Sequence, residues 1–147
     1  MSLITDKVFY NALRSNAELV ALVGGRIEST SIPVPDDQLD NEPVPYVIIS
    51  FDGLQNEGFT KDNNFEGDTD KVQVGVTVTA ESRDQLGNIM QMIRQTVIDY
   101  FEDDETHAWD DYAYIPTNYT LTASSVEYDS IKPCYYQTLT YNCDTNP

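Results

Sequence analysis

The sequence predicts an α+β fold: a mostly antiparallel four-stranded sheet with an amphipathic helix packed on one face and two short N-terminal helices. Valines alternate with polar or small residues between Val72 and Val78, which indicates a half-buried strand. Apolar residues then recur every three or four positions from Leu86 to Phe101, which indicates an amphipathic helix. At 147 residues the chain fits a single domain, since domains commonly hold about 100–200 residues, so we expect one domain over residues 1–147.

The first two helices are short and close together. The segment from Asp6 to Ser15 gathers its apolar residues on one helical face. Ser15 and Glu18 have the spacing of a capping box, in which the serine starts a helix and the glutamate supports it three residues later. This spacing predicts a second helix through Leu19 to Val23, ended by the pair Gly24-Gly25.

The first strands follow a proline-rich acidic loop. After a brief extended piece at Arg26–Glu28, the run Tyr46–Phe51 predicts a strand that Asp52-Gly53 ends. The polar stretch from Leu54 to Asp70 has no periodicity and predicts a long loop. The alternating strand then covers Thr69–Ala80.

A second capping box, Ser82 with Gln85, starts the long helix, and its acidic C-terminal turn predicts fraying between Tyr100 and Asp104. Two Thr- and Tyr-rich strands, Tyr119–Ala123 and Cys134–Cys143, complete the sheet as an antiparallel hairpin.

Charge is the strongest compositional feature of the chain. It holds 25 Asp and Glu against 8 Lys and Arg, a formal net charge of -17, and the basic residues stand singly. Such a surface repels phosphate groups, which argues against a nucleic-acid-binding protein and against docking on anionic membranes. The N-terminus lacks a basic segment followed by an apolar one, so we expect a protein made and kept in the cytosol.

Neither a catalytic site nor a cofactor is expected. The acidic cluster from Asp99 to Asp111, with the single histidine His107, could suggest a metal-dependent hydrolase, but consecutive acids point to different sides of one element. The segment starting at Asp62 follows a calcium-loop pattern, yet its twelfth position is Gln73 in place of the bidentate glutamate. Two cysteines are too few for a zinc site or a disulfide framework, and we expect buried free thiols.

Several passages occur in an order known from one family. The second helix ends in Leu19-Val20-Ala21-Leu22-Val23-Gly24-Gly25-Arg26-Ile27, the proline-bearing loop holds Ile32-Pro33-Val34-Pro35, and a strand begins at Pro45-Tyr46-Val47-Ile48. The valine strand and the long helix follow. In this combination the chain resembles the tail terminator, or tail-completion, proteins of long-tailed bacteriophages from about Leu3 to Phe101.

The resemblance implies a non-enzymatic structural protein of the virion, assembled in the bacterial host cytoplasm and located at the tail–neck junction. Such proteins form a homo-oligomeric ring, commonly hexameric, that caps the tail tube protein and offers a docking face to the head-neck connector or stopper protein. DNA passes through the lumen without specific binding, and no membrane is involved. A head-tail stopper or adaptor, and an acidic monomeric inhibitor or adaptor that mimics nucleic acid, remain as alternative functions.

Two groups of residues are candidates for this role. An acidic loop is expected to face the channel, where its charge would repel DNA; it comprises Asp62, Glu66, Asp68 and Asp70. Aromatic side chains supply contact area that suits subunit or partner interfaces. These candidates are Trp109, Tyr112, Tyr114, Tyr135 and Tyr141. For the first three, packing of their loop onto the core is an equally good interpretation.

Overall fold

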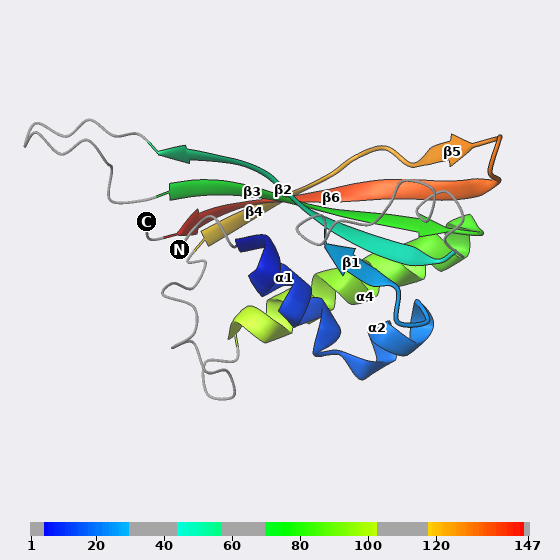
Figure 1. The fold of residues 1–147 in the computed structure, drawn as a ribbon, viewed down its shortest axis with the longest axis horizontal. Coiled ribbons are helices and arrows are strands. Elements are labelled where there is room, and N and C mark those ends of the chain that lie inside the picture. Colours follow the sequence, from blue (N-terminus) through cyan, green and yellow to red (C-terminus); the bar gives the residue numbers. More distant parts are fainter. Residues whose placement is uncertain (1–4, 30–43, 57–69, 103–117, 146–147) are drawn as a thin grey trace, which may run out of the picture.

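A computed structural model describes residues 5–29, 44–56, 70–102 and 118–145 of the chain (Figure 1). Its elements follow the order α1 (Thr5–Arg14), α2 (Ala17–Leu22), β1 (Ile27–Ser29), β2 (Tyr46–Asn56), β3 (Asp70–Ala80), α4 (Arg83–Glu102), β4 (Asn118–Ala123), β5 (Glu127–Asp129) and β6 (Cys134–Thr145). The α+β class and the order of the main elements agree with the sequence prediction. Fraying was predicted between Tyr100 and Asp104, but α4 continues to Glu102. Asp103 and Asp104 lie outside the described residues.

The sheet has six strands, so the prediction of four was wrong. Its order is β1-β2-β3-β6-β4, and β5 also pairs with β6. All pairings are antiparallel except that of β1 with β2, which makes the sheet mixed. Both additional strands have three residues, too few to show a period of their own, and they depend on the longer strands beside them.

All the labelled helices cover one face of the sheet, and the opposite face carries no described helix (Figure 1). We call this second face the helix-free face. The core lies between the layers, where α1 and α4 pack on the buried valines of β3, as their alternation predicted. On the helix-free face, the hydroxyl groups of Thr77 and Thr138 share a hydrogen bond of 2.9 Å.

An aromatic group joins three elements of the core. Phe9 of α1 is fully buried, with its ring centroid 5.3 Å from that of Phe101 in α4 and 5.0 Å from that of Tyr141 in β6. The angle between the rings is 68° for the first pair and 46° for the second, both within the range of favourable edge and tilted contacts. Phe9 therefore ties the first helix to both the long helix and the sheet.

Asn16 starts α2, and the prediction of Ser15 as its cap was wrong by one position. The Asn16 side-chain oxygen accepts hydrogen bonds from the backbone N–H groups of Glu18 at 3.0 Å and Leu19 at 3.3 Å. Its amide nitrogen donates to the Thr96 hydroxyl of α4 at 2.8 Å. A serine hydroxyl could not make both sets of bonds at these distances, because the asparagine amide separates acceptor and donor atoms. Ser15 instead donates to the carbonyl of Ala12 at 2.6 Å.

The glycine pair ends α2 as predicted. Gly24 and Gly25 have φ values of 61° and 76°, which other residues rarely adopt. The Gly25 N–H donates to the carbonyl of Val20 at 2.8 Å and the Gly24 N–H to that of Ala21 at 3.1 Å. These two bonds form a Schellman motif, which satisfies carbonyls that the helix end leaves open.

The prediction that this strand ends at Asp52-Gly53 was wrong, because β2 continues to Asn56. Phe51 pairs with Val74 and Gly53 with Gln73, so Asp52 is an extra residue that forms a β-bulge. The Asp52 carboxylate accepts a hydrogen bond of 2.7 Å from the Ser50 hydroxyl. Because the bulge preserves pairing on both of its sides, residues predicted to lie in a loop belong to the sheet.

Candidate assembly surface

The sequence-predicted site residues divide between described and undescribed parts of the chain. Six of them lie outside the described residues: Asp62, Glu66, Asp68, Trp109, Tyr112 and Tyr114. The predicted calcium loop and most of the acidic cluster, with His107, lie outside them too. The structure therefore places only Asp70, Tyr135 and Tyr141 of the predicted set.

Asp70 is the first residue of β3 and is only 6% exposed. The side-chain amide of Asn56, opposite it on β2, donates a 2.6 Å hydrogen bond to its carboxylate. Asp70 was predicted to belong to a loop that faces a channel, but it is a buried strand residue. A buried carboxylate held by a neighbouring strand fixes the end of the β2–β3 pair and presents little charge to solvent.

Tyr141 is 1% exposed and packs on Phe9, so its predicted role as a subunit contact was wrong. It shares the helix-covered face with Leu139 and Cys143, because alternate residues of a strand point to the same side. Moreover, β6 is an inner strand that pairs with both β3 and β4. Tyr135 is half-buried, and its ring lies 5.0 Å from that of Tyr128.

Exposed apolar side chains gather at the β5–β6 turn, at one end of the sheet. Ile131 is 95% exposed, Tyr128 55% and Tyr136 38%. The Asp129 carboxylate orders the turn by accepting a 3.0 Å hydrogen bond from the Ile131 N–H. Sequence reasoning missed Ile131, although an isoleucine between turn residues is a visible signal. Tyr128 lies opposite Tyr135 and therefore points to the face opposite that of Tyr136, so these exposed side chains do not form one continuous patch.

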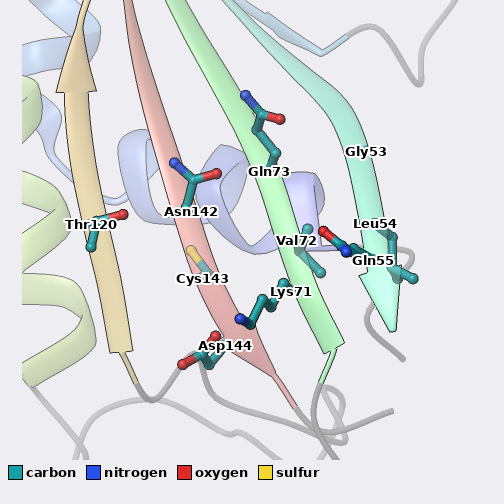
Figure 2. Close-up of a pocket in the computed structure, with 10 residues that line it drawn as sticks. All are labelled: Gly53, Leu54, Gln55, Lys71, Val72, Gln73, Thr120, Asn142, Cys143 and Asp144. Atoms are coloured by element: carbon teal, nitrogen blue, oxygen red, sulfur yellow. The ribbon is translucent and has the colours of Figure 1, made fainter. Parts of the chain in front are cut away.

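The other end of the sheet carries a shallow cleft of about 540 Å³. Figure 2 shows that its walls come from four neighbouring strands, β4, β6, β3 and β2. Thr120, Asn142 and Gln73 offer hydroxyl and amide groups, while Lys71 and Asp144 carry opposite charges. This lining suits hydrogen bonding with a polar surface.

Metal-binding clusters and membrane-spanning helices are both absent from the described residues. Within the described ranges, no group of three or more His, Cys, Asp or Glu residues is placed to hold a metal ion. None of the helices described combines the length and apolar character needed to cross a bilayer.

Both cysteines are free and buried, as predicted. Burial, together with the smaller effect of the nearby Asp144 charge, raises the pKa of the Cys143 thiol from 9.0 to about 12. Burial also raises the pKa of Cys134, with Asp129 acting in the same direction and Lys132 in the opposite one. Both thiols are therefore protonated and unreactive at neutral pH.

Because of this shift, alkaline pH should destabilise the wild-type protein more than a Cys143→Ala variant. Below pH 9.0 the Cys143 thiol is protonated in both folded and unfolded states, so its contribution is constant. Above this pH the unfolded thiol ionises first, and stability falls by up to about 1.4 kcal/mol per pH unit until the folded pKa is reached. Between pH 8 and 10.5 the wild type should lose about 2 kcal/mol more than the variant in urea unfolding. Equal losses in the two proteins would contradict the assignment.

One protein family and one solved structure are similar to this chain. Residues 7–110 match the family described as Tail completion protein gp17. No curated protein sequence matches the chain. Among solved structures, the fold is similar to that of a chain in the virion of a native gene transfer agent (GTA) particle, with a TM-score of 0.64 and 12% identity over 95% of this chain and 92% of that chain. At this identity the likeness shows a shared fold. Since the family match spans well over half of the sequence, this chain belongs to the tail completion protein gp17 family.

Proposed function

We propose that this structural tail protein is a tail terminator, which caps the tail tube and joins it to the head-neck connector. The observation that carries the proposal is the family match over residues 7–110. The fold shared with a chain of a gene transfer agent virion supports a location in the virion. Within the virion, the proposed role places the chain at the junction of tail and neck. In this role the chain acts through assembly and has no catalytic activity.

The terminator acts as a closed ring of six subunits. Head-to-tail contacts that close on themselves produce such a ring and leave two different faces, one for the tube and one for the neck. The net charge of -17 favours free passage of DNA through the lumen, because an acidic wall repels phosphate. The candidates for that wall are Asp62, Glu66 and Asp68, which lie outside the described residues, whereas buried Asp70 is not among them.

The test is the length of tail tubes assembled from the cognate tail tube protein with and without this chain. A terminator stops polymerisation, so its addition should give shorter tubes with a narrow length distribution and extra density at one end in electron micrographs. A stopper or adaptor would leave the length unchanged and bind only after a terminator is in place. A nucleic-acid mimic would bind neither tubes nor neck proteins. Unchanged lengths and bare tube ends would refute the terminator function.

A further inference from the structure

Among the described strands, the sheet has two edges without a pairing strand at the end that carries the cleft. On one side, β4 is the last strand of the sheet order. On the other side, β1 covers β2 only from Val47 to Ile49, and no other described strand pairs with the outer side of β2 beyond Phe51. Figure 2 shows these two edges as the outer borders of the cleft, with Thr120 on β4 and Gly53, Leu54 and Gln55 on β2.

The β4 edge lacks the usual protection against pairing. Natural edge strands avoid association through charged side chains, prolines, bulges or short length. The run from Asn118 to Val126 contains neither a charge nor a proline, in a chain with 25 acidic and 8 basic residues. On β2, Gly53 to Gln55 is likewise uncharged, and Leu54 is 38% exposed. Two copies that repel each other elsewhere can therefore approach at these edges.

The directions of the strands also match. Each neighbouring pair among β2, β3, β6 and β4 is antiparallel, so the two outer strands of this even set run in opposite directions. They also lie at the same level of the sheet, because Thr120 pairs with Asn142, Asn142 with Gln73, and Gln73 with Gly53. A copy placed beside another by rotation alone would bring β4 against β2 in the antiparallel arrangement.

We propose that β4 of one copy pairs with the Gly53–Gln55 segment of β2 in the next, so that head-to-tail repetition joins the sheets of the ring. The inference rests on the proposed terminator function and identifies the subunit interface. Backbone hydrogen bonds supply the specificity of the contact, as in other cases of strand addition. The helix-free face of every sheet then lies on the same side of the ring.

The hydrogen-bond pattern identifies the backbone groups that would make this contact. The Ser124 N–H donates to the carbonyl of Thr138 on β6 at 2.9 Å. Because antiparallel ladders use alternate residues, the N–H of Tyr119 points away from β6 and towards the free edge, at the level of Leu54 in β2. On β2, the Val47 N–H donates outward to Arg26 of the β1 segment at 2.9 Å, and the Asp52 bulge shifts the alternation so that the Leu54 N–H points outward.

Proline substitutions at these two positions test the interface. Tyr119→Pro and Leu54→Pro each remove one outward donor and leave the ladders to β6 and β3 in place. Each variant alone should remain monomeric in native mass spectrometry, at concentrations and on tube ends where the wild type forms rings, because every contact needs one intact β4 edge and one intact β2 edge. Mixed together, the two variants should give one-to-one dimers, since each keeps one intact edge. Tyr119→Thr is the matched control, because it keeps the N–H and should assemble like the wild type.

The outcomes separate the interface from the function. If Tyr119→Pro forms rings and caps tubes as the wild type does, the edge pairing is overturned and the terminator function stands. If wild-type chains form edge-dependent oligomers but never cap tubes, the terminator function falls and the interface stands. A wild type that remains monomeric both alone and on tube ends overturns the pairing. Circular dichroism and the one-to-one dimers show that the variants are folded.

Discussion

Replacing Phe9 by alanine is expected to lower the free energy of unfolding by about 3–5 kcal/mol. The side chain is fully buried, and its ring contacts Phe101 of α4 and Tyr141 of β6. Its removal would open a cavity where three elements meet, and rigid neighbours can fill such a space only in part. Domains of this size are commonly stable by about 5–15 kcal/mol, so the variant should lose a large share of its stability.

Urea unfolding followed by circular dichroism measures this change. Tyr128→Ala is the matched control, because it removes another paired aromatic ring from a side chain that is 55% exposed. It should change the free energy of unfolding by less than about 1 kcal/mol. Similar losses in the two variants would show that the aromatic group at Phe9 does not organise the core.

Asn16→Ala is expected to destabilise the protein by about 2 kcal/mol. Loss of the helix cap accounts for about 1 kcal/mol of this, and loss of the hydrogen bond to Thr96 for about another. That second bond joins α2 to α4 at 2.8 Å, and Thr96 is 6% exposed. The Thr96 hydroxyl keeps its own donation to the carbonyl of Met92, which limits the additional cost.

Two further variants separate the contributions at this site. Asn16→Ser keeps an acceptor for the cap but cannot reach Thr96 in the same way, so it should recover about half of the loss. Ser15→Ala should cost less than about 0.5 kcal/mol, since Ser15 is exposed and does not cap α2. Equal unfolding midpoints for Ser15→Ala and Asn16→Ala would contradict the assignment of Asn16 as the N-cap of α2.

Local periodicity explains which elements could be predicted. The alternation from Val72 to Val78 and the spacing from Leu86 to Phe101 are complete within one element, so they identify β3 and α4 without knowledge of the partners. The capping pair Ser82 and Gln85 is also local, and the Gln85 N–H indeed donates to the Ser82 hydroxyl at 3.1 Å.

Features that depend on distant partners escaped prediction. The parallel pairing of β1 with β2 and the short strand β5 exist only because longer strands lie beside them. The family resemblance identified the right family, yet it could not locate an interface. Tyr141 illustrates the difficulty, since a Tyr-rich strand suggests an interface until its parity with Leu139 and Cys143 is considered. Likewise, the uncharged run at β4 becomes informative only once β4 is known to be an edge.

The bulge at Asp52 also affects how relatives should be aligned. Val47, Ile49 and Phe51 point to the helix-covered side of the sheet from odd-numbered positions, whereas Leu54, opposite Val72, points to that side from an even-numbered one. Deleting Asp52 would make the alternation continuous and move every later residue of β2 by one position. A relative that lacks one residue at this point would therefore keep the same core. Beyond the bulge, homologous positions are better matched by the direction of their side chains than by counting along the chain.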